Sequence, residues 1–451
     1  MKETRTSVPR LKKGDVESNF VSSYLSIKKS RQCLLFISFL FFTTMALAKE
    51  IVVSIPSLTE ELSEALADEV EITLETFPAS GNYLILWLAP EYGLRPSHLR
   101  LAQALAKQNI EVWQTDISES LFMPQGLQSS KKHNGAITAA LIEYAHQSTG
   151  KKIILAGDSY AAITVLRGVN QWQKKQAKDA YLIGAILFSP NLYAYIPALG
   201  LAPEYMPVVA ATNIPIMIYQ ATKNGNIGQF DTLLAQLQTN NNPVYSKYLP
   251  NVMALFYAEE PTPPIKKQLN LLPLNIKKIL PLLQRHELPL NAIPIKTMQS
   301  NQRDIDRSLK TYSGKVTPLK IHLNDVYGKA IIKNNYQGKI TIVNFWATWC
   351  PPCVEEIPSL NRLKVQMTGL PFELISINYA EEKDTVLEFL KKINVEFPVL
   401  LDPNGEFAKQ WQVITFPSTF IIDPQGKIRY GVNAAIEWDD PKVIEALKSL
   451  L

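Results

Sequence analysis

The sequence predicts two α/β domains in series, each built on a sheet covered by helices, behind a short apolar segment. The chain has 451 residues, which is enough for two or three globular domains. Apolar runs of strand length alternate with helix-compatible stretches from residue 50 to about 260, and again from about 317 to 451. Between them, residues 261–296 contain seven prolines, a density that a central sheet cannot accommodate. We therefore expect four parts: residues 1–48, 49–260, a partly helical linker at 261–311, and 312–451.

Residues 1–48 are predicted to be an export signal. A basic stretch at residues 28–31 precedes an apolar run from Cys33 to Met45, and the segment ends in Ala46, Leu47 and Ala48. Counted through Ala48, the run is shorter than the roughly 20 residues that span a bilayer as a helix. We expect an exported, periplasmic protein cleaved after Ala48; the alternative is a membrane anchor formed by residues 33–48.

The net charge of +5 is concentrated in this segment. It holds eight of the 46 Lys and Arg residues and three of the 41 acids, so 38 of each remain. A balanced remainder offers no broad electrostatic attraction to nucleic acid or to an acidic membrane surface. Nucleic acid is therefore not an expected partner.

The cysteines indicate redox chemistry. After cleavage only Cys350 and Cys353 remain of the three, in a single C-x-x-C. A zinc site needs four Cys or His ligands, and the nearest histidine is His322, so no metal is expected. A purely structural disulfide would close a loop of a few residues and would stabilise the fold little. We therefore expect a redox-active disulfide and no further cofactor.

The flanking residues support this interpretation. A β-branched and aromatic run at residues 341–346 predicts a strand, and a helix-compatible stretch follows from Val354, so Cys350 falls at a helix N-terminus. The unpaired N–H groups and the helix dipole there stabilise a thiolate. Cys353 lies one turn inside the helix and can resolve a mixed disulfide. Pro351 and Pro352 stiffen the loop and suit the first helical turn.

The segment FWATWCPPCVEEIP resembles the active site of TlpA-like and ResA-like thiol-disulfide oxidoreductases of the thioredoxin superfamily, and the similarity covers residues 312–451. It implies a thioredoxin-like fold, a cis-proline at Pro417, and a proton-accepting role for Glu356 near Cys353. Phe416 would offer backbone hydrogen bonds to an extended substrate. Two alternatives stay open: Glu356 as a solvated helix carboxylate and Pro417 as an ordinary edge-strand proline.

The same resemblance defines an expected substrate-binding set and an activity. The set consists of Trp349, Pro351, Pro352, Phe416 and Pro417. The implied activity is reduction of disulfides in partner proteins, with electrons supplied by a thiol donor in the membrane.

The first domain carries a second motif. Gly157-Asp158-Ser159-Tyr160-Ala161 places a serine on a predicted strand-to-helix turn, as in the nucleophile elbow G-x-S-x-G. Residues 50–260 resemble an α/β-hydrolase, a doubly wound sheet. A triad requires an acid and then a histidine after the serine; the acid is missing from its usual place after the strand-like residues 215–219, Asp231 lies a little later, and His286 is the only later histidine before the second domain. We expect a domain that has lost this chemistry and binds or positions something; a serine esterase using Ser159, with an accessory redox domain, is the competing function.

Overall fold

The computed structural model describes residues 48–56, 69–175, 180–254, 256–258, 262–297, 308–314 and 317–451. The predicted export signal lies outside these residues, apart from Ala48. No helix in the described ranges is long and apolar enough to cross a membrane.

The first sheet has eight strands in the order β1-β2-β4-β3-β5-β6-β7-β8. β1 and β4 pair with β2 in antiparallel fashion, whereas all neighbours from β4 through β8 are parallel. Every residue of β4, β6 and β7 is buried, as expected for parallel strands covered on both faces. The strands are β1 (Lys49–Pro56), β2 (Glu69–Phe77), β3 (Tyr83–Leu88), β4 (Ile110–Thr115), β5 (Lys152–Asp158), β6 (Leu182–Phe188), β7 (Ile216–Ala221) and β8 (Val244–Leu249).

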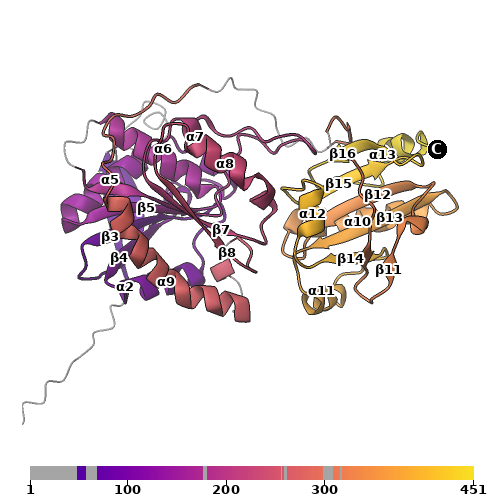
Figure 1. Ribbon diagram of the computed structural model, residues 1–451, viewed down its shortest axis with the longest axis horizontal. Helices are drawn as coiled ribbons and strands as arrows, with labels where there is room; N and C mark the ends of the chain where they lie inside the picture. The colour runs from indigo at the N-terminus through magenta and orange to yellow at the C-terminus, as the bar shows by residue number, and fades with distance from the viewer. Residues whose placement is uncertain are drawn as a thin grey trace, which may run out of the picture. The chain divides into compact units, whose positions relative to one another are not determined.

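Helices cover both faces of this sheet (Figure 1). Because side chains alternate along a strand, Leu86 and Leu155 pack with α5, α6 and α8, whereas Ile85 and Ile154 pack with α2 and α9. The helices are α2 (Pro96–Ala106), α3 (Ile117–Ser120), α4 (Leu127–Lys132), α5 (Ala136–Thr149), α6 (Ala161–Lys174), α7 (Pro207–Ala210), α8 (Phe230–Leu237) and α9 (Pro263–Gln284), with 3-10 helices at Gly225–Gln229 and Phe256–Ala258.

The predicted linker differs from what its prolines suggest, because most of its described part belongs to the first domain. α9 continues through Pro273 and Pro281, and Leu272, Ile276 and Leu280 are buried in the core on the α2 side of the sheet. A proline inside a helix costs about 3 kcal/mol. Burial of several large apolar side chains, each contributing about 1.5–3 kcal/mol, outweighs that cost.

The residues after α9 also belong to this domain, on the opposite face of the sheet. Leu288 is buried in the core that contains α6. Side-chain amides of Asn170 and Gln173 on α6 donate hydrogen bonds to the backbone carbonyls of Ile293 and Pro289. The first domain therefore extends well beyond residue 260.

The second sheet has six strands in the order β14-β13-β12-β15-β16-β9. β12 is central, parallel to β13 and antiparallel to β15. The strands are β9 (Lys310–Thr311), β12 (Ile340–Trp346), β13 (Phe372–Tyr379), β14 (Val399–Asp402), β15 (Ser418–Ile422) and β16 (Ile428–Val432), and a separate hairpin joins β10 (Leu323–Asn324) to β11 (Ala330–Ile331). The helices are α10 (Pro351–Gln366), α11 (Lys383–Leu390), α12 (Glu406–Gln410) and α13 (Pro441–Lys448), with a 3-10 helix at Lys333–Asn335.

Candidate active site

A disulfide between Cys350 and Cys353 lies where β12 passes into α10. All seven residues of β12 are buried, which anchors the strand that leads to the site. Cys350 is the N-cap residue of α10, and its Sγ accepts a hydrogen bond from the Cys353 backbone N–H at 3.3 Å. Pro351 and Pro352 occupy the first turn, where their missing N–H groups have no helical partner. In the dithiol form, the same N–H group and the helix dipole would stabilise a thiolate on Cys350.

The carboxyl group of Glu356 is buried one turn after Cys353. Oε1 accepts a hydrogen bond from Asn344 Nδ2 at 2.8 Å, and Oε2 accepts one from Trp438 Nε1 at 2.9 Å. Its side chain is 2% exposed, and this burial raises its pKa from 4.5 to about 7. A carboxyl group with such a pKa can exchange a proton near neutral pH.

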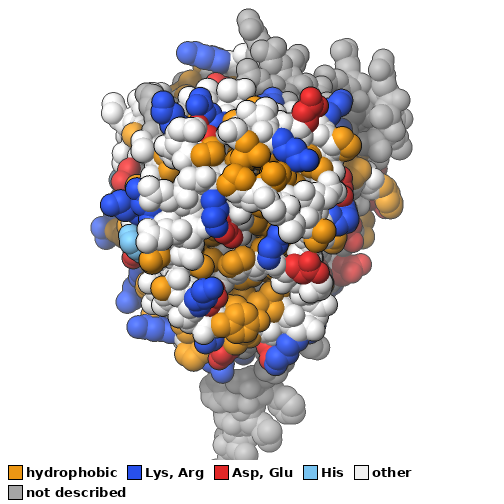
Figure 2. Space-filling view, turned by 90° about the vertical axis from the view of Figure 1, so that its right-hand side faces the viewer, with side chains coloured by type: hydrophobic (Ala, Val, Ile, Leu, Met, Phe, Trp, Pro, Cys, Tyr) orange, Lys and Arg blue, Asp and Glu red, His pale blue; other side chains and the backbone are white. Residues whose placement is uncertain are grey.

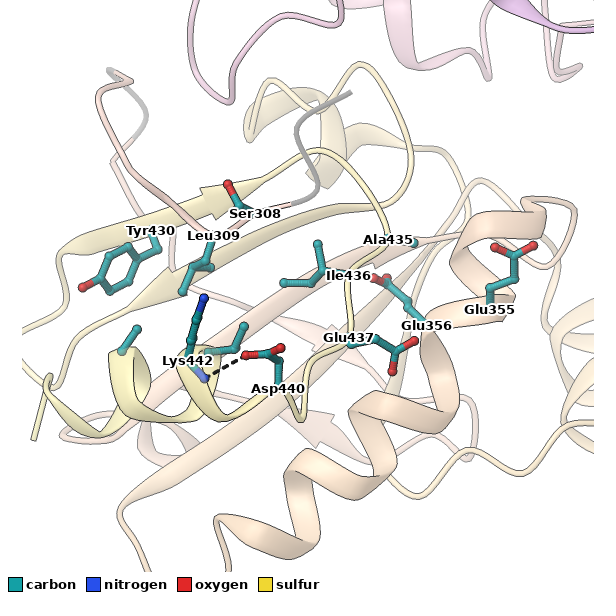
Figure 3. A pocket seen from close by; sticks show the side chains of 12 residues that line it. Ser308, Leu309, Glu355, Glu356, Tyr430, Ala435, Ile436, Glu437, Asp440 and Lys442 are labelled. Atoms are coloured by element: carbon teal, nitrogen blue, oxygen red, sulfur yellow. Dashed lines mark hydrogen bonds between the residues drawn. The ribbon is translucent and has the colours of Figure 1, made fainter. Parts of the chain in front are cut away.

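A cavity of about 580 Å³ opens beside this carboxyl group. Figure 3 shows Glu356 and Ile436 at its wall, with Asp440 and Lys442 at the beginning of α13 on another side. Glu355 also lines it, but its side chain is exposed. The cavity thus places open space next to the buried carboxyl group of Glu356.

Three aromatic rings lie near the disulfide. The Phe416–Pro417 peptide bond is cis, directly before β15. The ring of Phe416 lies 5.9 Å from that of Trp349 and 4.6 Å from that of Tyr379, measured between centroids. Trp349, which directly precedes Cys350, is 47% exposed. Tyr379 is buried beneath the other two rings, so an apolar partner surface can contact Trp349 and the half-buried Phe416 of this aromatic strip.

Glu381 fixes the loop that leads from β12 to Cys350. Its carboxylate accepts hydrogen bonds from the Thr348 backbone N–H at 2.8 Å, from Thr348 Oγ1 at 2.5 Å, and from Asn378 Nδ2 at 2.7 Å. Burial raises the pKa of this carboxyl group. Ala380 lies between the end of β13 and Glu381, and its backbone is left-handed with φ 59°. Two segments far apart in the chain are thereby joined beside the disulfide.

Sequence reasoning missed Asn344, Tyr379, Glu381 and Trp438. One signal was present for Asn344, because an amide in the middle of an otherwise apolar strand usually has a specific partner. Glu381 follows a predicted strand, as many site residues do. Nothing in the order of residues links Trp438 to a carboxyl group 82 positions earlier.

Ser159 lies on a tight turn between β5 and α6 in the first domain. Its backbone is left-handed with φ 48°, and a Cβ on Gly157 would lie 2.8 Å from a methyl carbon of Val165. Ser159 Oγ donates a hydrogen bond to Oε1 of Glu91 at 3.1 Å, and the Tyr160 N–H donates to Oε2 at 3.4 Å. The serine hydroxyl is thus paired with a carboxyl group, not with a histidine.

The structure does not bring Ser159, Asp231 and His286 together, so the triad of the competing esterase function is not formed. His286 Nε2 is hydrogen-bonded to Tyr245 Oη at 2.7 Å, and Tyr245 lies at the beginning of β8. Ser159 directly follows the end of β5, in the same parallel part of the sheet. Ser159 therefore lies beyond the C-terminal ends of the parallel strands and His286 lies near their N-terminal ends. The two residues are separated by at least about the length of a strand, roughly 20 Å. Asp231 lies in the first turn of α8.

The acid next to Ser159 faces the interior. Asp158 accepts hydrogen bonds from Trp87 Nε1 at 2.7 Å and from Tyr257 Oη, and His98 Nε2 lies 3.9 Å from its Oδ2. Burial raises the pKa of Asp158 to about 7 and lowers that of His98 to about 4. This closed network contributes to the core and does not activate the serine. Within the described ranges, no cluster of three or more Asp, Glu, His or Cys side chains is placed to hold a metal ion.

Comparisons with known proteins concern the second domain. Residues 313–431 match the AhpC/TSA family. The thiol-disulfide oxidoreductase ResA of Bacillus subtilis is 36% identical over 106 residues, covering 24% of this chain and 59% of that protein. ResA of Geobacillus thermodenitrificans is 31% identical over 127 residues, covering 28% and 73%. The chain spans 61% of the length of ResA from Bacillus thuringiensis, at 37% identity over 24% of this chain.

Solved structures give similar matches. StoA from Bacillus subtilis has 27% identity and a TM-score of 0.26, with 30% of this chain and 98% of that chain covered. A thiol:disulfide interchange protein of the thioredoxin family from Chlorobium tepidum has 25% identity and a TM-score of 0.27, with 30% and 99% covered. All these relatives correspond to less than a third of the chain.

Proposed function

Because the chain belongs, through its C-terminal domain, to the ResA family of thiol-disulfide oxidoreductases, we propose that it reduces disulfides in partner proteins outside the cytoplasm. The observation that carries this proposal is the Cys350–Cys353 disulfide at the N-terminus of α10, with the buried carboxyl group of Glu356 one turn further along the helix.

The reaction begins with both cysteines reduced. The Cys350 thiolate attacks one sulfur of the partner disulfide, whose S–S bond breaks as a mixed disulfide forms and one partner thiolate leaves. Glu356 accepts the proton of the Cys353 thiol, and the Cys353 thiolate attacks the Cys350 sulfur. The second partner thiol is released, and Cys350 and Cys353 end as the disulfide. Two electrons have passed to the partner, and a thiol donor in the membrane restores the dithiol.

The partner binds across the aromatic strip beside the disulfide. An extended segment would pair with the backbone at Phe416, next to the cis peptide bond of Pro417, and its apolar side chains would contact Trp349. Pro351 and Pro352 are exposed on the other side of Cys350 and complete the binding surface. Release of the partner exposes the ring of Trp349 again.

The first domain is of the α/β-hydrolase type and binds or positions a component of this reaction. Its strand order, its left-handed Ser159 on the turn after β5, and helices on both faces support that assignment. The esterase alternative lacks support, because the hydroxyl of Ser159 is hydrogen-bonded to Glu91 and His286 lies near the opposite end of the parallel strands. Export by the predicted signal in residues 1–48 would deliver both domains to the periplasm.

Trapping of partners tests the proposal. Cys353→Ala keeps the attacking thiol but cannot resolve, so it should accumulate a mixed disulfide with partner proteins in cell envelopes. The control is the double variant Cys350→Ala/Cys353→Ala, which should yield none. The reductase function is excluded if Cys353→Ala forms no more adducts than the double variant while wild-type protein still cycles between dithiol and disulfide.

A further inference from the structure

α2 and α9 form a basic layer on one face of the first sheet. The two helices are in contact, and both bury their apolar side chains in the same core (Figure 1). There is no acidic residue from position 95 to 110 or from 262 to 286. The exposed cations of this basic layer are Arg100, Lys107, Lys266, Lys267, Lys277, Lys278 and Arg285. None of them forms an ion pair with another described residue.

Leucines are exposed among these cations. Leu271, Leu274 and Leu282 are 44%, 46% and 37% exposed. At 100° per residue, Leu274 lies opposite the buried Ile265 and Leu283, so it projects from the centre of the outer face of α9. The outer face therefore combines positive charge with partly exposed apolar side chains.

An ordinary solvated helix face is the simplest alternative, but it differs from this layer in two respects. Solvated helices usually mix both signs of charge, often as Glu and Lys four residues apart. The face of the protein shown in Figure 2 has such a mixture, with Lys and Arg lying among Asp and Glu. A solvated helix face also has little reason to expose leucines, because apolar side chains are stabilised by burial away from water. The overall balance of 38 bases and 38 acids after residue 48 thus conceals a local excess of positive charge.

We propose that the basic layer docks on the surface of an anionic lipid bilayer. Lys and Arg would lie among the lipid phosphates, and Leu271, Leu274 and Leu282 would enter the boundary between headgroups and acyl chains. A polyanion such as nucleic acid would be attracted by the cations but would leave the leucines in water. The proposal does not depend on the redox reaction. Docking would hold the second domain close to a thiol donor in the membrane.

Vesicle binding tests the proposal on residues 49–451, the chain expected after cleavage of the export signal. We expect this protein to sediment with vesicles that contain phosphatidylglycerol, but not with vesicles of phosphatidylcholine alone, and to be released by salt. Lys267→Glu/Lys278→Glu should weaken binding by about tenfold or more. Leu271→Ser/Leu274→Ser should weaken it as well, although both side chains are exposed and the fold should persist.

The matched control is Lys392→Glu/Lys448→Glu, which makes the same change in charge on exposed lysines of the second domain. It should bind vesicles as the wild type does. All variants should keep the circular dichroism spectrum and the cooperative thermal unfolding of the wild type, which shows that both domains are folded. Equal loss in the control, equal binding to neutral vesicles, or no binding by the wild type would overturn the proposal. Self-association that is abolished by Leu271→Ser/Leu274→Ser without vesicle binding would instead assign the layer to a second copy of the chain.

Discussion

Trp438 Nε1 donates a hydrogen bond of 2.9 Å to Oε2 of Glu356, although 82 residues separate the two. Trp438 is fully buried, and Asn344 donates to the other carboxylate oxygen from β12. Both donors favour the ionised carboxylate, whereas burial favours the protonated acid and is the larger effect. The balance keeps the pKa of Glu356 near neutrality, where a carboxylate can take the proton of Cys353 and later return it.

Removal of the indole donor should shift the pH dependence of the resolving step. In Trp438→Phe a smaller aromatic ring replaces the indole and the hydrogen bond to Glu356 is lost, so the pKa of Glu356 rises above its wild-type value of about 7. The rate at which a preformed mixed disulfide is resolved should then need a higher pH to reach its maximum. Stopped-flow measurement across a pH series checks this. The control is Trp346→Phe, because Trp346 is also buried but donates its hydrogen bond to Ser376. This variant should leave the midpoint of the pH dependence unchanged.

The same carboxyl group should make folding stability fall as pH rises. The pKa of Glu356 is raised from 4.5 to about 7 in the folded protein, so between these values the folded state binds more protons than the unfolded state. The protonated acid is compatible with burial, and stability is lost as the group ionises. Glu356→Gln should remove this contribution, which urea unfolding at about pH 5 and about pH 8 would measure. An unchanged difference between the two pH values would contradict the assignment.

The redox centre could be predicted from the sequence because its signals are local. A strand, two cysteines three residues apart and a helix beginning with prolines are contiguous between residues 340 and 366. The partners of Glu356 and Thr348 could not be predicted, because hydrogen bonds from Trp438 and to Glu381 depend on how distant segments fold together. Asp231 and His286 were chosen by chain order alone, and the direction of the strands separates His286 from Ser159.

The loop before Cys350 should depend on Glu381. Glu381→Ala leaves the Thr348 N–H and hydroxyl without their acceptor, which typically costs about 2–3 kcal/mol for hydrogen bonds to a charged group. We expect a lower free energy of unfolding and slower attack by Cys350 on a model disulfide. Asp384→Ala alters an exposed acid in the first turn of α11 and should have a small effect on both. Similar losses in the two variants would show that the loop does not rely on Glu381.

α9 offers a direct test of where the first domain ends. The apolar spacing in residues 265–283 follows a helix, but the prolines favoured a linker because each removes a hydrogen bond. Leu280 is fully buried, so Leu280→Ala should lower the free energy of unfolding by about 2–5 kcal/mol. Leu282→Ala, at a 37% exposed position on the same helix, should cost much less. Calorimetry of the two variants compares them, and equal small effects would restore the linker interpretation.

Ser159 should fail to react as a hydrolase nucleophile. Activation of a serine requires a base that withdraws its proton and an oxyanion site that is free for the substrate. Here Glu91 accepts the hydrogen bond of Ser159 and also occupies the Tyr160 N–H, which follows the serine as an oxyanion donor would. Burial raises the pKa of Glu91, and its carboxyl group occupies the N–H group that an oxyanion would need. Incubation with a fluorophosphonate should therefore leave wild-type protein as unlabelled as Ser159→Ala, measured by intact mass. A stoichiometric adduct on Ser159 that is absent from Ser159→Ala would reinstate the esterase and make Glu91 its base.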